Sequence, residues 1–183
     1  MKTKRWRMLG SLLVCLLLAA LLPVISVQGK DYTSFVPKAD SYPFIVISKA
    51  ELSLALVDSL GQALAVYPIA CSRFYGNKER RGDNKTPEGS FKINELLYSA
   101  NIPHDFHDGK GPIKGAYGPW FLRLSVPGFN DIGIHGTHLP ESIGTRASEG
   151  CIRMRNADLL QLKPRVRLGT PVIILPEGEK IPQ

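Results

Sequence analysis

Short strand-forming segments recur along this chain, and turn-forming residues separate them. The segments are rich in β-branched, aromatic or alternating apolar residues and lie at positions 44–47, 52–57, 63–69, 90–93, 120–124, 132–134 and 172–175. Turn chemistry at residues 58–61, Asp-Ser-Leu-Gly, predicts a β-hairpin between the second and third segments. Because no helix alternates with these strands, the pattern predicts an antiparallel-dominated sheet or barrel and disfavours a doubly wound α/β fold.

The remaining segments include one helix and two long loops. Residues 156–162 are predicted to be helical, with Asn156 as the N-cap, Asp158 in the first turn and two leucines on one face. Residues 72–84 are polar, residues 99–118 are rich in Gly, Pro, His and Asp, and neither stretch has a regular period. Loops of this length in a compact domain are usually functional or mobile. We therefore expect both loops to flank a site.

The first 29 residues have the layout of a secretory signal. Four basic residues precede an apolar run over residues 9–24, and more polar residues follow up to Gly29. A signal peptide over residues 1–29 is therefore expected. The alternative is a retained membrane anchor, since the run approaches the roughly 20 residues that span a bilayer. Either outcome predicts an exported domain, in the periplasm or cell envelope. Cys15 lies inside the run and is not expected to carry a lipid.

The composition describes one globular domain. With 44% hydrophobic and 21% charged residues in a length of 183, the chain holds enough apolar material for a core, which excludes a disordered tail protein. Residues 30–42 are expected to form a linker, residues 43–176 the single domain and residues 177–183 a tail.

Most of the net positive charge resides in the first segment. The whole sequence has 23 Lys and Arg against 16 Asp and Glu, a formal charge of +7, but without residues 1–29 the balance is 19 against 16, or +3. The basic residues between positions 78 and 85 are interrupted by Glu79 and Asp83 and are expected to form a solvated loop. Nucleic acid is therefore not an expected partner. A membrane is expected only if the first segment is retained.

Two segments in the second half of the chain carry a histidine and a cysteine. One reads Ile-His-Gly-Thr at residues 134–137, and the other reads Ser-Glu-Gly-Cys-Ile-Arg-Met at residues 148–154. A cysteine becomes an acyl acceptor when a neighbouring base takes its proton, and His135 could be that base for Cys151. The backbone amide of Gly150 could face a developing oxyanion. The pair taken alone is also compatible with a structural cysteine and histidine.

Together with other segments, these motifs resemble the L,D-transpeptidase catalytic domain family, also called the YkuD family. The resemblance covers about residues 43–175 and rests on the following further segments: Thr-Pro-Glu-Gly-Ser-Phe at 86–91, Gly-Pro-Trp at 118–120, and Gly-Thr-Pro-Val at 169–172. It implies a mainly β fold, a barrel or sandwich of mixed, mostly antiparallel strands, with one short helix after the catalytic cysteine.

The resemblance also implies a chemistry. Cys151 matches the family's nucleophile and His135 its general acid/base, while the Gly136 carbonyl would orient the histidine and the Gly150 amide would bind the oxyanion. The implied reaction is acylation of the thiol by a peptidoglycan tetrapeptide stem with release of D-Ala. Transfer to an amine then forms a 3-3 cross-link, and transfer to water gives L,D-carboxypeptidase activity. No metal or organic cofactor is expected, and carbapenem-type β-lactams are expected inhibitors.

Five further residues are expected to bind substrate. Arg153 carries a guanidinium that suits a substrate carboxylate, with a structural ion pair as the alternative. Tyr117 and Trp120 are expected to wall the cleft, with core packing as the alternative. Ser148 and Thr137 belong to the two motifs and are expected to line the same site.

One position departs from the usual signature of the family. That signature most often reads Ser-His-Gly-Cys, and this chain has Glu149 in place of the second histidine. A negative charge near the sulfur disfavours the thiolate, so we expect lower reactivity than in relatives. The alternative function is a catalytically weak or inactive wall-binding domain.

Zinc binding, a different peptidase class and oxidation are the remaining alternatives. His-x-x-His spacings at residues 104–107 and 135–138 could supply zinc ligands with Cys151, but a metal on this sulfur would block the acyl chemistry. In papain-like peptidases the cysteine precedes the histidine, whereas His135 comes first here. Cys71 is expected to pack in the core. Its functional alternative is a disulfide with Cys151, which needs the two sulfurs close in space.

Overall fold

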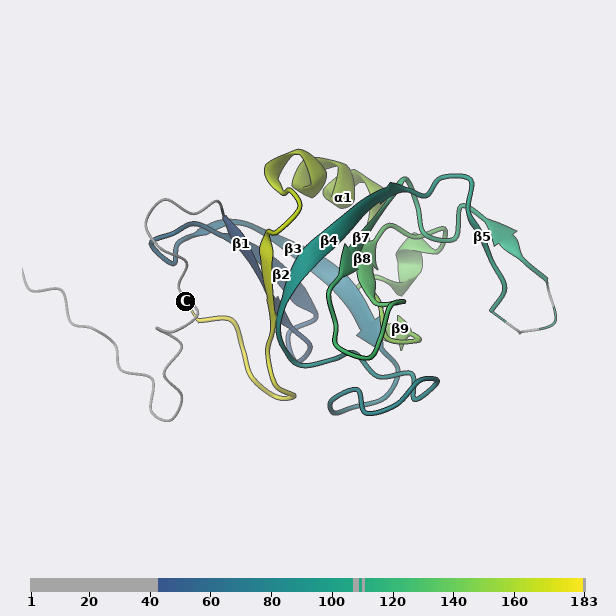
Figure 1. The fold of residues 1–183 in the computed structure, drawn as a ribbon, viewed down its shortest axis with the longest axis horizontal. Coiled ribbons are helices and arrows are strands. Elements are labelled where there is room, and N and C mark those ends of the chain that lie inside the picture. Colours follow the sequence, from purple (N-terminus) through teal and green to yellow (C-terminus); the bar gives the residue numbers. More distant parts are fainter. Residues whose placement is uncertain (1–42, 107–108, 110, 183) are drawn as a thin grey trace, which may run out of the picture. The chain divides into compact units, whose positions relative to one another are not determined.

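The computed structural model describes residues 43–106, 109 and 111–182, and in this part of the chain nine strands form one sheet closed into a barrel (Figure 1). The strand order is β10-β8-β7-β4-β11-β1-β2-β3-β9, and pairing of β10 with β3 closes the barrel. The strands are β1 Phe44–Ser48, β2 Ser53–Val57, β3 Ala63–Ser72, β4 Gly89–Tyr98, β7 Trp120–Leu124, β8 Gly133–His135, β9 Arg146–Ser148, β10 Ile152–Met154 and β11 Pro171–Ile174.

Both orientations of strand pairing occur in the sheet. β1 pairs in parallel with β11, β8 with β10, and β3 with β9, while the other pairs are antiparallel. The mainly β, mostly antiparallel fold predicted from the sequence is therefore confirmed. A separate two-stranded hairpin, β5 Pro103–His104 with β6 Ile113–Lys114, projects at the right of Figure 1.

The predicted signal and linker, residues 1–42, lie outside the described residues. Within the described residues, no helix is both long and apolar enough to cross a bilayer.

β1 is buried on both of its faces, which explains its continuous apolar sequence. Successive side chains of a strand point to opposite faces, so Ile45 and Ile47 enter the main core inside the barrel. Phe44 and Val46 point the other way and form a second cluster with Leu175. The strand is therefore held by apolar packing on two sides, and its register with β2 and β11 is strongly specified.

The short helix α1, Asn156–Leu162, follows β10 and lies against the barrel (Figure 1). Its bounds match the predicted helix, and Leu159 and Leu162 enter the core. The predicted N-cap is wrong: Arg155 is the N-cap, and Asn156 is the first helical residue. The Asn156 side chain instead accepts a hydrogen bond at 2.9 Å from the backbone amide of Thr137. It ties the helix to the segment that follows β8.

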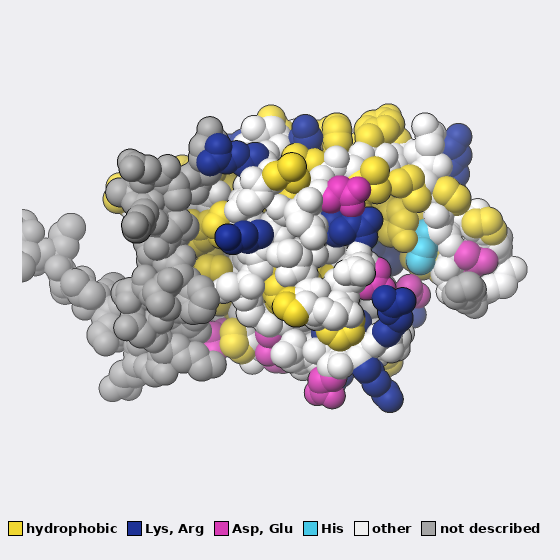
Figure 2. All heavy atoms as spheres, viewed as in Figure 1, with side chains coloured by type: hydrophobic (Ala, Val, Ile, Leu, Met, Phe, Trp, Pro, Cys, Tyr) yellow, Lys and Arg dark blue, Asp and Glu magenta, His cyan; other side chains and the backbone are white. Residues whose placement is uncertain are grey.

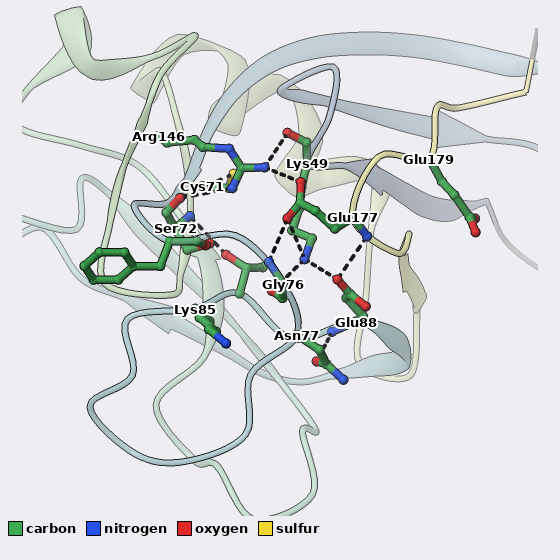
Figure 3. Close-up of polar contacts among 12 residues, drawn as sticks. Lys49, Cys71, Ser72, Gly76, Asn77, Lys85, Glu88, Arg146, Glu177 and Glu179 are labelled. Carbon is green, nitrogen blue, oxygen red and sulfur yellow. Dashed lines mark hydrogen bonds and ion pairs between the residues drawn. The ribbon is translucent and has the colours of Figure 1, made fainter.

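A buried network of charges holds the loop between β3 and β4 at both of its ends (Figure 3). Lys49 is fully buried, and its Nζ contacts the Gly76 carbonyl at 3.0 Å, Glu88 Oε1 at 2.6 Å and Glu177 Oε2 at 3.3 Å. Arg146 pairs with the other oxygen of Glu177. Gly76 and Glu88 lie at the two ends of the loop, so Lys49 alone anchors both ends.

Candidate active site

A cavity of about 280 Å³ collects residues from four separate segments of the chain. His135 comes from β8 and Cys151 from the turn before β10, while His104 and Tyr117 belong to the loop over residues 99–118. The loop between β3 and β4 adds further lining residues. In Figure 2, a histidine side chain lies beside hydrophobic and acidic side chains close to the β5–β6 hairpin. The two long loops expected to flank a site therefore line the same cavity.

His135 is buried and neutral, with one ring nitrogen committed to the backbone. Its Nδ1 lies 2.6 Å from the carbonyl oxygen of Gly136. A carbonyl only accepts hydrogen bonds, so Nδ1 carries the proton and Nε2 keeps its lone pair. Burial lowers the pKa of His135 to about 3; the contact with Gly136 opposes this shift, and the charges of Arg153 and His104 add to it. The arrangement provides a free base at Nε2.

Two aromatic rings fix the plane of the His135 imidazole. Phe121 stacks on it with ring centres 5.3 Å apart and planes 7° from parallel. Tyr117 meets it edge-on, with centres 5.0 Å apart and an interplanar angle of 86°. Phe121 is the direct partner of His135 in the β7–β8 pairing, so the stacking follows from strand register. The imidazole has little freedom to rotate.

Cys151 is a protonated thiol in this environment. Its Sγ lies 3.2 Å from the backbone carbonyl oxygen of Asp131. Burial raises the pKa of Cys151 to about 11, and the charge of Asp131 adds to this shift. A backbone hydrogen bond from Gly133 and the charges of Arg153 and Lys78 oppose it. Asp131 is therefore an acidic side chain that acts on the thiol, and sequence reasoning did not identify it.

The turn that carries Cys151 is closed by Ser148. The Ser148 hydroxyl accepts from the Gly150 amide at 3.1 Å and donates to the Cys151 carbonyl at 2.5 Å. Gly150 has φ +132°, and a Cβ there would lie 2.9 Å from the Lys85 carbonyl oxygen, so glycine is required. Because its amide is bonded to Ser148, the oxyanion role of Gly150 stays a prediction that this contact does not support.

Arg153 enters the cavity from β10, beside His135 in the β8–β10 pairing. It is only 7% exposed, and burial lowers its pKa while the charges of Cys151 and Glu149 oppose that shift. Its guanidinium lies over the ring of Phe106 at 5.5 Å. Among the described residues, its side chain forms no hydrogen bond or ion pair. A buried cation that has no counter-ion among the described residues is suited to an anionic ligand.

Two of the predicted substrate residues lie outside the cavity lining. Thr137 is buried, and its backbone is tied to Asn156. Trp120 packs edge-on against Tyr98, with ring centres 5.6 Å apart, and Lys163 covers its ring at 4.3 Å. Tyr117, Ser148 and Arg153 do line the cavity. The structure thus brings part of the predicted set together and leaves these two in packing roles.

The loop after β3 contributes residues that the sequence did not single out. Lys78, expected in a solvated loop, is 9% exposed and lines the cavity. Its Nζ lies 2.8 Å from Asp83 Oδ1. Burial by itself raises the pKa of Asp83. Hydrogen bonds from Lys78 and from three loop amides outweigh this effect and hold the pKa well below its ordinary value. The expectation of a solvated loop holds for residues 79–82, which are exposed, but not for Lys78, which is buried and paired with Asp83.

Two alternatives concerned the cysteines: a disulfide between Cys71 and Cys151, and a zinc site. His107, one of the histidines considered as a zinc ligand, lies outside the described residues. Cys71 and Cys151 are both free. Cys71 is fully buried, as expected for a core residue. No group of three or more His, Cys, Asp or Glu side chains among the described residues is arranged to hold a metal ion.

The comparisons with known proteins agree on one family. The model of the L,D-transpeptidase catalytic domain family, YkuD, matches residues 42–174. A protein of Bacillus licheniformis named as L,D-transpeptidase YkuD is 48% identical over 138 residues, which cover 75% of this chain and 68% of that protein. Its namesake in Bacillus subtilis is 34% identical over 113 residues, covering 62% of this chain and 54% of that protein.

A solved structure shows the same fold. L,D-transpeptidase 3 from Mycobacterium tuberculosis, in complex with a faropenem-derived adduct, superposes with a TM-score of 0.55 at 17% identity. The match covers 73% of this chain and 60% of that one. The family match, the Bacillus licheniformis relative and the shared fold together show that this chain belongs to the L,D-transpeptidase catalytic domain family, YkuD.

Proposed function

We propose that this protein is a cysteine L,D-transpeptidase that acts on peptidoglycan stem peptides, with Cys151 as nucleophile and His135 as general acid/base. The observation that carries the proposal is the neutral His135, which lies in the same cavity as the thiol; its Nδ1 is held by Gly136, and its Nε2 forms no hydrogen bond with the described residues. Family membership supports the reaction class.

In the first half-reaction the thiol attacks the donor stem. His135 Nε2 takes the proton of Cys151 as the sulfur bonds to the carbonyl carbon at the L-centre of the third stem residue. The tetrahedral intermediate then collapses, and the bond to D-Ala breaks. His135 returns the proton to the leaving amine, so the products are a thioester on Cys151 and free D-Ala.

The second half-reaction releases the acyl group to an acceptor. An amine of a neighbouring stem attacks the thioester carbonyl, loses a proton to His135 and forms a 3-3 cross-link as the thiol is regenerated. Water in place of the amine gives a shortened stem, which is L,D-carboxypeptidase activity. No step needs a redox change, and the proton that His135 takes from the acceptor re-protonates the Cys151 sulfur as the thioester bond breaks.

Arg153 is proposed to hold the donor stem by a carboxylate. Its buried guanidinium has no ion pair with the described residues, so an entering carboxylate supplies the missing counter-charge. This contact places the peptide across the cavity that also contains Cys151. Arg153→Lys is then a poor substitute, since an ammonium cannot form the bidentate pair.

β-Lactams of the carbapenem type are proposed as inhibitors. A solved relative carries a faropenem-derived adduct, and a strained lactam carbonyl is open to the same attack by a thiol. The protein is further proposed to act after export, in the periplasm or cell envelope, because its stem-peptide substrate lies there and its first 29 residues have the layout of a signal.

The test is turnover of purified muropeptides that carry tetrapeptide stems. The wild-type protein is expected to release D-Ala and to give cross-linked or shortened stems, and Cys151→Ala is expected to give neither. Intact mass spectrometry after faropenem treatment should show one adduct on the wild type only. Binding of muropeptides without turnover or adduct would favour the catalytically inactive wall-binding domain instead.

A further inference from the structure

Glu149 begins a chain of contacts that runs around the cavity. Its Oε2 lies 3.5 Å from His104 Nε2, and His104 Nδ1 lies 2.8 Å from the hydroxyl oxygen of Tyr117. The Tyr117 ring then meets the imidazole of His135 edge-on. The carboxylate comes from the turn before the nucleophile and the other two groups from the loop over residues 99–118. All four side chains line the cavity.

The contacts fix where the protons lie. A carboxylate only accepts hydrogen bonds, so it favours the proton on His104 Nε2. His104 Nδ1 is then an acceptor, and the Tyr117 hydroxyl donates to it. Burial raises the pKa of Tyr117 to about 12, and the charges of Cys151 and Glu149 add to the shift, so the hydroxyl keeps its proton at neutral pH. Glu149 therefore favours one direction for the hydrogen bond between Tyr117 and His104.

We propose that Glu149 is a positioning residue that acts through His104 to hold Tyr117 against His135. Phe121 stacks on the imidazole, and Tyr117 meets both of these rings at nearly a right angle, with its ring centre 5.0 Å from that of His135 and 5.4 Å from that of Phe121. Without the Glu149 carboxylate, the proton of His104 is no longer held on Nε2, so the hydrogen bond that fixes the Tyr117 hydroxyl loses its single direction. The Tyr117 ring is then held less firmly beside the imidazole. The proposal rests on the proposed function, in which His135 must face the thiol.

The same contact contributes little to the stability of the fold. The side chains of His104 and Glu149 are 27% and 38% exposed, and ion pairs at such exposure are weak because water screens them. Their removal should therefore change the reaction more than the melting temperature. This separates a positioning role from a structural one.

The experiment is a double-mutant cycle on Glu149→Gln and His104→Gln, with Glu141→Gln as the matched control at an exposed site. The measured quantities are the rate of adduct formation with faropenem, the rate of alkylation of Cys151 by iodoacetamide and the melting temperature. Each single variant is expected to slow adduct formation about tenfold, because a small displacement of a group that positions the general base lowers the rate strongly. The double variant should be no slower than either, and Glu141→Gln should match the wild type.

A nuclear magnetic resonance readout tests the contact without any reaction. The imidazole nitrogens of His104 should report a proton on Nε2 in the wild type and a mixture of tautomers in Glu149→Gln. The proposal is overturned if the single variants react as fast as the wild type, or if their effects are simply additive. Absence of a faropenem adduct on the wild type, with alkylation still slowed in Glu149→Gln, would count against the proposed function and leave the positioning role standing.

Discussion

Gly136 shows how one residue serves both packing and chemistry. Its carbonyl accepts from His135 Nδ1, and its lack of a side chain admits the helix N-terminus. A Cβ at this position would lie 2.2 Å from Asn156 Oδ1 and 3.0 Å from the Cα of Gly118. Contacts this short cannot be relieved by moving one flexible side chain, because the second of them is to backbone.

The rate of acylation should depend little on pH across the neutral range. The pKa of His135 is about 3 and that of Cys151 about 11, so both groups are neutral between these values and the base form of His135 is fully present. Faropenem adduct formation is expected to stay constant from about pH 5 to about pH 9 and to fall only as the pH approaches 3. Stopped-flow rates across this range measure it.

The control is alkylation of Cys151 in the His135→Gln variant, which has no general base. Without the imidazole the reaction needs the thiolate, so its rate should climb steadily toward pH 11. A step in the wild-type rate near pH 6.5, the ordinary pKa of histidine, would contradict a neutral His135 imidazole beside a neutral Cys151 thiol.

His135 and Cys151 were expected in one site because their motifs, together with the other matching segments, resemble the family. The sequence could not show that Asp131 and Lys78 act on the thiol. These side chains reach the cavity only through the path of the loops, and loop paths leave no periodic signal. Glu149 was expected to weaken the thiolate, yet its contact with His104 depends on a loop residue that spacing alone does not connect to it.

At the scale of elements, the loop after β3 depends on Lys49. Replacing this residue by methionine removes the cation between Glu88 and Glu177 and leaves two partly buried carboxylates facing each other. We expect the free energy of unfolding to fall by about 3–5 kcal/mol, the usual cost of breaking a buried ion pair by removing one partner. Urea denaturation measures the change.

Lys92→Met is the matched control, since Lys92 lies exposed on β4. It should change the unfolding free energy by no more than about 0.5 kcal/mol. The Lys49→Met variant should also be cut faster by proteases within the loop between Gly76 and Glu88, because both ends of this loop lose their anchor. Equal stability of the two variants would refute a clamping role for the network.

Elements were predicted best where a local pattern is strong. Helix α1 has the expected bounds, because two leucines at helical spacing meet the core. β4 continues to Tyr98, beyond the predicted end at residue 93, since its second half pairs with β7 after a register shift. β9 was not predicted, because Arg146–Ser148 has no strand-like composition and is held by parallel pairing with β3.

For the whole molecule, stability should carry a signature of the buried imidazole. The folded pKa of His135, about 3, lies below its ordinary value of 6.5. Protonation of His135 therefore favours the unfolded state. The contribution of the neutral imidazole to the free energy of unfolding is fully present above pH 6.5 and is lost as the pH falls toward 3. The difference in unfolding free energy between the wild type and His135→Gln should shrink steadily over this range.

Urea denaturation at pH 7, 5 and 4 measures this difference, and the other titrating groups cancel between the two proteins. A difference that is the same at each pH would mean that the imidazole is charged in the folded state or reaches solvent.

The closure of the barrel could not be derived from local patterns. Hairpins such as β2–β3 follow from turn chemistry, but the pairing of β10 with β3 and of β1 with β11 joins segments that no short turn connects. Such contacts are set by the packing of the whole sheet. The class of fold was therefore predictable, whereas strand order was not.

The place of β11 between β1 and β4 has a consequence for when the protein can fold. A ribosome makes β1 and β4 early and β11 late, and until the last strand emerges the two earlier strands have an unfilled gap between them. Contacts of such long sequence separation form slowly. A chain that is threaded through a membrane N-terminus first would thus stay open during its passage and close only on the far side.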